Sequence, residues 1–526
     1  MFAVEAGRLA LGTPTAFFDL LPNSWLTLPP SWHADIYDEP QGSLWPGTAY
    51  EDGCPSRFFA GGRGKQPQMQ SAAAIKATIA EIRDTYLKDR RPWVIGFSGG
   101  KDSTCTLQLV WQALRGLNKP QLLKPIYVIS SDTLVESPAI VSYIKQTMAS
   151  IERYAKSDKL PITANVVQPL VQDSFWVNMI GRGYPAPNSK FRWCTDRLKI
   201  QPANRFIRDQ VARFGEVVLV LGVRSAESAT RAQVMAMHSI EGTRLKSHRS
   251  LLGALVFAPI ADWTTDDVWS YLLQNADTPW HTDNNDLAAM YRSADGECPL
   301  VVDTTTPSCG NSRFGCWVCT VVTRDKTMEA MIDSGQWWME DLLRLRDFLA
   351  ETQTPERRKE VRAIRKLSGQ ILLKSHADEA SPGPYTFDFC KELLGKVLTI
   401  QSRLPADAGG FALITESELL AIRQIWRQER NDWEDSVPRI YEETTGRQWF
   451  SISDTTTVVE QEVAVIDETA REYGIPALLL RKLIDAERRS QGLRRRSDIY
   501  KDLEDVLNQD WRDDATVSAD LELLRK

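Results

Sequence analysis

Two periodicities of apolar residues alternate along residues 71 to about 270. Apolar runs typical of buried strands occupy residues 92–97, 125–131, 162–167 and 217–223. Patterns typical of helices lie before and between them, at 71–88 and from Thr104 to about residue 116. Strands that alternate with helices predict an α/β fold, a doubly wound parallel sheet with helices on both faces.

The other residues predict three regions of different character. Residues 1–70 are rich in proline, glycine and aromatic residues and show little periodicity, so we expect an irregular N-terminal extension without catalytic residues. Residues 271–330 are loop-like and contain a cluster of cysteines. Residues 331–526 are mainly helical, with amphipathic patterns near 338–350, 356–374, 387–400, 415–430 and 476–490 and a linker or surface loop at 402–410.

The composition limits the class of protein. A chain of 526 residues with 43% hydrophobic residues is long enough for about three globular domains. It has no apolar run near the ~18 residues of a membrane span and no signal peptide, so we expect a cytoplasmic protein without a membrane partner. The formal net charge of −6 excludes a strongly basic nucleic-acid-binding protein.

The predicted helical region is acidic. Residues 331–526 contain 29 Lys and Arg against 37 Asp and Glu, a net charge of −8. This charge suits docking to partner proteins more than gripping DNA. Two basic clusters, at 357–366 and 488–496, are interpreted as solvated helix faces, with phosphate contacts as the alternative.

The apolar run at 92–97 ends in a glycine loop. Its residues are Ser98, Gly99, Gly100, Lys101, Asp102 and Ser103. Backbone N–H groups of such a loop, and of the helix N-terminus after it, bind phosphates. The spacing is not that of a Walker loop and resembles the pyrophosphate loop of ATP pyrophosphatases, which cut ATP between its α- and β-phosphates. The resemblance implies that these six residues bind pyrophosphate, with side-chain contacts from Lys101 and Ser103.

Further motifs follow the loop in chain order. They are Arg192-Trp193-Cys194-Thr195 with Lys199, then Leu221 to Ser228 with Arg231, then Pro259 to Thr264 with Asp267-Val268-Trp269. This order resembles the adenine nucleotide α-hydrolase-like superfamily, and within it the sulfonucleotide (PAPS) reductases and the small subunit of sulfate adenylyltransferase.

The residue types in these motifs suit phosphoryl transfer, which depends on positioning and on cations that stabilise charge on the phosphorus oxygens. We expect phosphate contacts from four cationic residues: Arg192, Lys199, Arg224 and Arg231. Asp102 or Asp132 could hold a magnesium ion, and we assign Gly222 to the same nucleotide site. Trp263 and Trp269 are interpreted as core residues.

Two cysteines of this region lead to opposite predictions. Cys194 lies between Arg192 and Arg197, whose charges favour a thiolate, and a thiolate can carry a persulfide. We therefore predict that Cys194 is catalytic, with a buried structural cysteine as the alternative. Cys105 lies in the helix after the loop at a position suited to packing, so we predict a core residue.

Four of the eight cysteines lie close together in the sequence: Cys298, Cys309, Cys316 and Cys319. Four thiolates at this spacing predict a metal site, either one tetrahedral zinc or an iron–sulfur cluster. Pro299, Gly310 and Gly315 suit the tight turns that bring ligands together. Spacing alone does not choose the metal.

This cysteine spacing and the motifs of residues 71–330 resemble the DndC family, the ATP pyrophosphatase and sulfurtransferase of bacterial DNA phosphorothioation. The resemblance continues more loosely through the helical region, as far as Arg494 to Tyr500. It favours a [4Fe–4S] cluster over zinc. It implies an enzyme that uses ATP to activate a DNA backbone phosphate and replaces a non-bridging oxygen by sulfur. It also implies other phosphorothioation (Dnd) proteins as partners and a cysteine desulfurase as sulfur donor.

Other functions remain open. Iron–sulfur sulfonucleotide reductases have two adjacent cysteines and a nucleophilic cysteine near the C-terminus; this chain has neither, which disfavours a reductase. The alternatives are a tRNA thiolase, which acts on a base carbonyl, and a non-catalytic nucleotide sensor of a defence complex. If all four clustered cysteines ligate iron, Cys194 is favoured as the sulfur carrier; if one does not, the cluster could hold the sulfur.

Overall fold

The computed structural model describes most of the chain from Ala72 onward. The described residues are 72–225, 244–248, 250–295, 315–366, 370–371, 373–374, 377–380, 382–405, 411–450, 460–490, 499–512 and 516–517. All of them belong to one compact unit, Gln66–Lys526. The extension expected at residues 1–70 lies outside the described part. No helix in the described ranges has the length and apolar character needed to cross a bilayer.

A six-stranded sheet forms the core of the N-terminal half. Its strands are β1 (Trp93–Gly96), β2 (Ile126–Ser131), β3 (Ile162–Val167), β4 (Val217–Val220), β5 (Lys246–Ser247) and β6 (Ala254–Phe257). They lie in the order β3-β2-β1-β4-β6-β5, and every neighbouring pair is parallel except β5 and β6. The four predicted strands are confirmed. The edge strands β5 and β6 were not predicted, because they are short.

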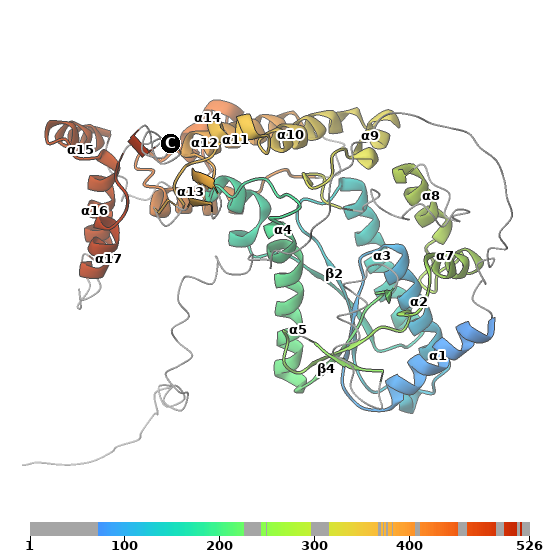
Figure 1. The fold of residues 1–526 in the computed structure, drawn as a ribbon. Coiled ribbons are helices and arrows are strands. Elements are labelled where there is room, and N and C mark those ends of the chain that lie inside the picture. The colour runs from blue at the N-terminus through green and yellow to red at the C-terminus, as the bar shows by residue number, and fades with distance from the viewer. Residues whose placement is uncertain are drawn as a thin grey trace, which may run out of the picture. The chain divides into compact units, whose positions relative to one another are not determined.

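Helices cover both faces of this sheet (Figure 1). The helices are α1 (Ala72–Leu87), α2 (Lys101–Arg115), α3 (Pro138–Ser157), α5 (Gln201–Phe214) and α7 (Thr265–Gln274). Trp93 and Ile95 of β1 pack in one core with α1, α2, α3 and α7, whereas Val94 packs in another core with Ile207 of α5. This alternation follows from the period of two along a strand. The predicted doubly wound architecture is therefore confirmed.

The predicted loop character of residues 271–330 is wrong for much of its described part. Helix α8 occupies Asn284–Asp295 and helix α9 occupies Lys326–Asp333. Asn284 forms the start of α8, and its amide group donates hydrogen bonds to the carbonyl oxygens of Leu272 (3.1 Å) and Asn275 (2.8 Å). Such a tertiary anchor is not readable from periodicity.

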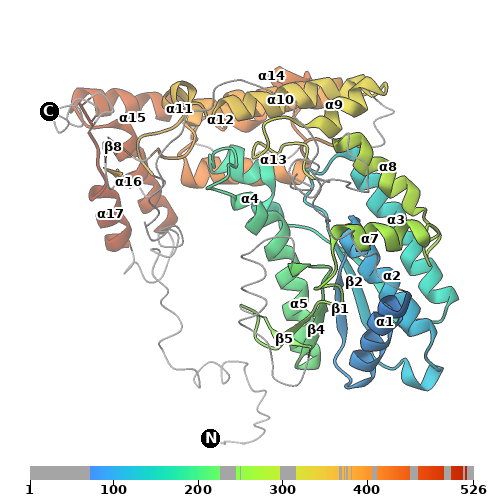
Figure 2. The same cartoon turned by 45° about the vertical axis from the view of Figure 1, so that its right-hand side comes forward.

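The helical half begins with α9 and packs on a second hydrophobic core. Its main helices are α10 (Glu340–Glu351), α11 (Pro355–Val361), α12 (Phe387–Arg403), α13 (Glu416–Glu429) and α14 (Ser436–Thr445), gathered beside the short α4 (Trp193–Thr195) (Figure 2). Leu345, Leu393 and Trp426 share this core with Trp193 and Trp317. The motif that contains Cys194 and the segment that contains Cys316 are thus supported by the helical half.

The helix predicted at 356–374 ends early, at Val361. The guanidinium of Arg362 donates to the carbonyl oxygens of Gly383 (2.5 Å) and Pro382 (3.0 Å), and a short hairpin of β7 (Leu373–Lys374) and β8 (Ala377–Ala380) follows. Tertiary hydrogen bonds therefore override the helical pattern here.

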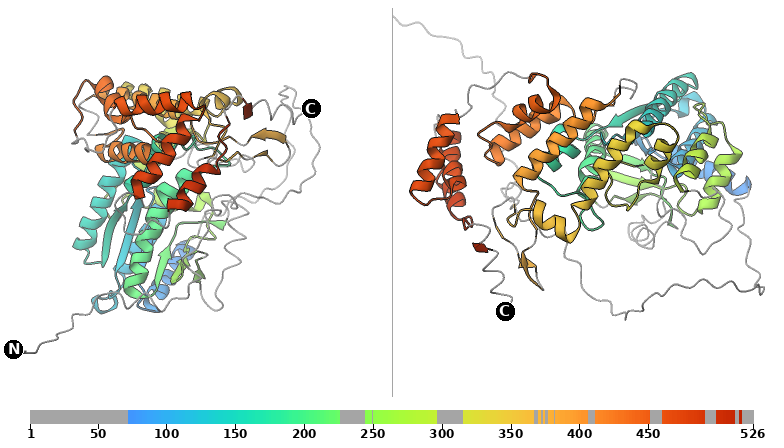
Figure 3. Two further views of the ribbon diagram at one scale, coloured as in Figure 1. Left: turned by 90° about the vertical axis from the view of Figure 1, so that its left-hand side faces the viewer. Right: turned by 90° about the horizontal axis from the view of Figure 1, so that it is seen from above.

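Helices α15 (Glu460–Glu472), α16 (Ala477–Ser490) and α17 (Ile499–Leu507) form a separate group near the C-terminus (Figure 3). Trp433 packs against Ile466 of α15 and Ile484 of α16. Arg365 donates a hydrogen bond of 3.0 Å to the carbonyl oxygen of Asp510. The group is thus joined to the rest of the helical half by both apolar and polar contacts.

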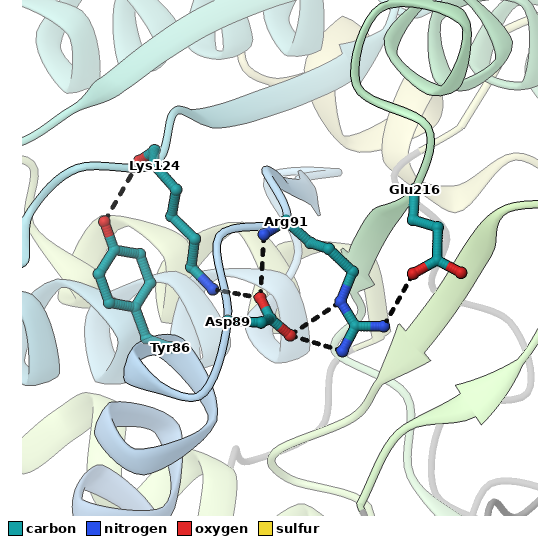
Figure 4. Close-up of polar contacts among 5 residues, drawn as sticks. All are labelled: Tyr86, Asp89, Arg91, Lys124 and Glu216. Carbon is teal, nitrogen blue, oxygen red and sulfur yellow. Dashed lines mark hydrogen bonds and ion pairs between the residues drawn. The ribbon is translucent and has the colours of Figure 1, made fainter.

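A polar network joins α1 to the amino ends of β1, β2 and β4 (Figure 4). The carboxylate of Asp89 accepts bonds from Arg91 (2.5 Å) and from Lys124 (3.1 Å), and Arg91 also pairs with Glu216 (3.2 Å). The side chain of Lys124 is 3% exposed and lies over the ring of Tyr86, 4.6 Å from its centroid. Burial lowers the pKa of Lys124. A buried ammonium depends on its carboxylate partner.

We expect Asp89→Asn to lower the free energy of unfolding by about 2 kcal/mol, because it leaves Lys124 buried without a counter-charge. Urea denaturation measures this change. The matched control is Glu216→Gln, whose carboxylate is 57% exposed and whose loss should cost at most ~0.5 kcal/mol. Equal losses in the two variants would contradict the assignment.

Candidate functional site

The predicted pyrophosphate loop connects β1 to α2, and its last three residues form the first turn of that helix. Gly99 has a φ of 72°, which favours glycine. The Ser103 hydroxyl accepts from the Ser98 N–H (3.3 Å) and donates to the Gly100 carbonyl (2.9 Å), which closes the loop. Gly100 is the N-cap of α2 and supplies no side-chain cap. The N-terminus of α2 is therefore suited to an anion.

Two predicted cations meet at the start of α2. The Asp102 carboxylate pairs with Lys101 Nζ at 3.1 Å and with Arg224 Nε at 2.7 Å. The side chains of Lys101 and Arg224 are 8% and 5% exposed, so this is a buried cluster with a net positive charge rather than a surface salt bridge. Such a cluster beside a helix N-terminus favours bound phosphate.

Gly222, assigned to the nucleotide site, is located where β4 ends against α2. A Cβ atom added to it would lie 2.6 Å from the Asp102 carbonyl oxygen and 2.9 Å from the Thr106 hydroxyl. Glycine is required because two backbones approach closely. The structure thus gives Gly222 a packing role that positions Asp102.

The two candidate magnesium ligands are engaged with protein groups. Asp132 accepts from the N–H of Leu134 (2.9 Å) and from the Gln168 amide (2.9 Å), which shapes the turn after β2. Asp102 takes Arg224 on one oxygen and Lys101 on the other. Neither carboxylate is arranged as a magnesium ligand among the described residues.

The motif around Trp263 is structural. Thr264 and Asp267 form a reciprocal capping box at the start of α7. Trp263 and Trp269 are 4% and 3% exposed and belong to the main core, as predicted, and so does Cys105 at 0%. The adjacent Thr265 hydroxyl accepts a bond of 3.1 Å from Arg224. The motif therefore fixes the guanidinium that faces Asp102.

Tyr291 of α8 is a site residue that the sequence analysis missed. Its hydroxyl accepts a bond of 3.3 Å from the Lys101 N–H, and Lys101 Nζ lies 5.5 Å from the centroid of its ring. The ring of Trp269 packs against Tyr291 at 5.1 Å, edge to face. Nothing in the local sequence indicated that α8 returns to the loop.

One cavity connects the loop to three cysteines. It has a volume of about 310 Å³ and is lined at one end by Ser98, Gly100 and Tyr291. At the other end its walls include Arg192, Cys194, Lys199, Cys316, Cys319 and Lys326. The structure thus brings Cys194 and Lys199 together with two members of the predicted cysteine cluster.

The carboxyl end of β2 holds Cys316 in place. Glu136 and Cys316 form an isolated antiparallel bridge, and the Trp317 N–H donates to the Val135 carbonyl (3.0 Å). The Cys316 thiol lies 3.3 Å from the Thr133 hydroxyl and 3.7 Å from the Glu136 carboxylate. Burial and the charge of Glu136 raise the pKa of Cys316, so the thiol is protonated in this state.

Lys199 lies between the thiols and Glu136. It belongs to a π-helical turn, Asp196–Ile200, and its Nζ is 3.3 Å from the Glu136 carboxylate. Burial alone would lower the pKa of Lys199, but the charges of Cys316, Glu136 and Cys194 raise it. Lys199 is therefore a permanent cation at the thiol end of the cavity.

The expectation that neighbouring arginines favour a Cys194 thiolate is wrong for the structure as described. Burial, followed by the charge of Cys319, raises the pKa of Cys194. Arg197 forms an ion pair with Asp173 at 2.7 Å. The prediction rested on sequence neighbours, whereas the spatial neighbours of the thiol are another thiol and a buried wall.

Arg346 of α10 is a second residue that the sequence analysis missed. Its side chain is 2% exposed and donates to the carbonyl oxygens of Cys319 (3.0 Å), Thr323 (3.0 Å) and Val322. A guanidinium presents five donors in a fixed fork, so Arg346 holds the turn after Cys319. The helical half thereby positions one of the predicted ligands.

Three predicted site residues lie outside the described ranges: Arg231, Cys298 and Cys309. Among the described residues no group of three or more His, Cys, Asp or Glu is arranged to hold a metal. The cysteine cluster is thus represented by Cys316 and Cys319, with Cys194 beside them.

Comparison with known proteins agrees with this fold. The sequence model of the phosphoadenosine phosphosulfate reductase domain matches residues 92–321. An uncharacterized protein of Methanocaldococcus jannaschii is 30% identical over 196 residues, which are 37% of this chain and 34% of that protein. The chain spans about a third of the length of the curated relatives it matches. Residues 92–321 therefore form a phosphoadenosine phosphosulfate reductase-like domain.

Solved structures include two of related interest. The phosphoadenylyl-sulfate reductase of Candida auris is 15% identical, with a TM-score of 0.26, covering 42% of this chain and 94% of that one. The U34-tRNA thiolase NcsA of Methanococcus maripaludis, solved with its [4Fe–4S] cluster, is 14% identical, with a TM-score of 0.27, covering 53% of this chain and 80% of that one.

We expect Gly222→Ala to destabilise the protein by about 1–3 kcal/mol, because the new Cβ must displace the backbone of Asp102. Chemical denaturation measures the loss. Gly395→Ala in α12 is the matched control: the nearest atom to its added Cβ is 3.9 Å away, and alanine in a helix interior should stabilise by about 0.5–1 kcal/mol. Two changes of the same sign would contradict the packing role of Gly222.

Proposed function

We propose that this chain uses ATP at the loop Ser98–Ser103 to activate a DNA backbone phosphate and replaces one of its non-bridging oxygens by sulfur. The observation that carries the proposal is the cavity that joins the loop to Cys194, Cys316 and Cys319. An activated intermediate formed at one end of this cavity lies within reach of sulfur held at the other. Water has less access to such an intermediate than on an open surface.

The nucleotide end supplies positioning and positive charge. The N-terminus of α2 and the Lys101–Asp102–Arg224 cluster face the pyrophosphate of ATP in this proposal. The DNA oxygen attacks the α-phosphorus of ATP, the new oxygen–phosphorus bond forms, and the bond to the β-phosphate breaks. Pyrophosphate leaves and AMP remains on the DNA phosphate.

The thiol end supplies the sulfur. A persulfide on Cys194, loaded by a cysteine desulfurase, attacks the activated phosphorus with its terminal sulfur, and AMP leaves with the former DNA oxygen. A dithiol reductant then cleaves the sulfur–sulfur bond. The DNA keeps the sulfur, the reductant becomes a disulfide, and Cys194 returns as a thiol. The cation of Lys199 stabilises negative charge on the sulfur before the attack.

The donor set fits a thiolate-binding metal. Cys316 and Cys319 are two soft ligands on one turn, with the Cys319 N–H bonded to the Cys316 carbonyl (3.1 Å), and soft ligands select zinc or iron–sulfur centres. In the proposal Cys298 and Cys309 complete the set. A [4Fe–4S] cluster would supply an electron-accepting, sulfur-binding centre, whereas zinc would supply a structural tie.

The choice of DNA rests on the cysteine spacing and the long helical half, which resemble the DNA phosphorothioation family. The acidic helical half, with a net charge of −8 over residues 331–526, suits docking to other proteins of such a system. Those partners then contribute to the grip on DNA.

We expect Lys101→Ala to lower pyrophosphate release by about 100-fold or more, because it removes a buried cation from the phosphate site. Release is measured with DNA and partner proteins present, and DNA phosphorothioate by mass spectrometry. The control is Lys156→Met, whose side chain is 72% exposed on α3. If DNA sulfur persists while a tRNA thionucleoside disappears, the protein is a tRNA thiolase. ATP binding without any pyrophosphate release by the unaltered protein would indicate a nucleotide sensor.

Replacing single cysteines separates the carrier from the metal ligands. We expect Cys316→Ser to lose bound metal, and Cys194→Ser to keep it while abolishing sulfur transfer. Metal analysis and the visible spectrum of anaerobically purified protein measure the first effect. Cys390→Ala is the control, since that thiol is buried in the helical core at 0% exposure. Loss of metal from Cys194→Ser would overturn its role as a free carrier and make it a ligand.

A further inference from the structure

A second cavity lies in the helical half, and the proposed chemistry makes no use of it. Its volume is about 830 Å³, and it shares no lining residue with the first cavity. Its walls come from residues 363–366, from α12 and α16, and from the loops 429–434, 474–478 and 509–512. A space of this size is in the range of cavities that take a nucleotide-sized ligand.

The lining of this cavity is positively charged although the helical half is acidic. Seven Lys and Arg residues line it against four Asp and Glu residues. Six of the cations are Arg365, Lys366, Lys391, Arg430, Lys482 and Arg512. Like charges in a concave wall focus the electrostatic potential, so the cavity suits an anion.

Neutral groups fix two of these cations. The Arg430 guanidinium donates to the Tyr385 carbonyl at 2.9 Å, and Lys482 Nζ donates to the Gln509 side-chain oxygen at 2.7 Å. A neutral acceptor fixes the position of a cation without cancelling its charge. The positive field of the cavity is therefore largely preorganised.

Aromatic rings alternate with the cations. Lys391 Nζ lies 4.4 Å and the Arg430 guanidinium 5.3 Å from the centroid of Phe387, and Lys482 Nζ lies 5.3 Å from that of Trp511. Trp511 is partly exposed. Cations beside aromatic rings are typical of grooves that bind single-stranded nucleic acids, where phosphates contact the cations and bases stack. An acidic peptide would need only the cations.

Gathering these charges costs folding free energy. Burial lowers the pKa of Lys482, and burial with the charge of Arg362 lowers that of Lys366. Asn431, in the loop that lines the cavity, has a φ of 54°, a strained conformation for a residue with a side chain. A bound anion would offset both costs.

We propose that this cavity binds a short phosphodiester segment of single-stranded nucleic acid, with phosphates on Lys391, Arg430 and Lys482 and a base against Trp511. The proposal goes beyond the sulfur chemistry, because binding at this cavity requires neither ATP nor a sulfur donor. It also gives the basic residues of the 357–366 cluster that line the cavity, Arg365 and Lys366, a role near phosphate rather than on a solvated helix face.

The test is binding of the full-length protein to a labelled oligothymidylate, measured by fluorescence anisotropy over a range of salt concentrations without ATP. We expect the double variant Lys391→Met/Lys482→Met to bind about tenfold more weakly. Two lost phosphate contacts should also reduce the slope of log K against log salt by about 1.4. Lys391→Met alone should show about half of this change in slope.

Lys396→Met is a closely matched control. Lys396 is on the same helix as Lys391, lies 4.7 Å from the centroid of Phe348 and pairs with Glu392, but it does not line the cavity. We expect its binding to be unchanged. Three outcomes would overturn the proposal: wild-type binding by the double variant, an equal loss in Lys396→Met, or displacement of the oligonucleotide by polyglutamate at equal charge concentration. Thermal melting of each variant verifies that it is folded.

Discussion

The backbone bridge between Glu136 and Cys316 is the contact on which the arrangement of the site depends. It ties the thiol segment to the carboxyl end of β2, and β2 pairs in parallel with β1, whose carboxyl end carries the phosphate-binding loop. Parallel strands end at the same edge of a sheet, where ligands of such folds bind. A loop suited to anions and a group of cysteines thereby share one cavity, although more than 200 residues separate Ser98 from Cys316 in the sequence.

Much of the motif sequence supports this edge rather than contacting a ligand. Gly222 lets β4 approach the start of α2, and Thr264 with Asp267 caps α7 so that Thr265 can receive Arg224. Arg224 then balances Asp102 inside a buried wall. The cost of burying these charges is offset only while each has its partner, so the residues behave as one unit.

The sequence predicted what local patterns specify. The apolar runs gave the four central strands, including β3 with its observed bounds, and the glycine loop gave the start of α2. Tyr291, Glu136 and Arg346 escaped prediction because each acts through a contact with a distant segment. The helix expected to reach residue 374 ended at Val361 for the same reason, since Arg362 is held by the carbonyl groups of residues 382 and 383. Arg231, Cys298 and Cys309 stay predictions.

The environment of Cys194 sets a requirement for any sulfur chemistry at this cavity. Burial and the nearby Cys319 raise the pKa of Cys194, so the resting group is a neutral thiol, a weak nucleophile and a weak ligand. A persulfide is more acidic than a thiol, and a bound metal ion also favours loss of the proton, so either state would draw negative charge into the cavity. Lys199, which interacts with Cys194, Cys316 and Glu136, is positioned to balance that charge. The cation therefore serves the thiol end of the cavity as Lys101 serves the phosphate end, which places charge compensation at both sites where the proposed reaction develops it.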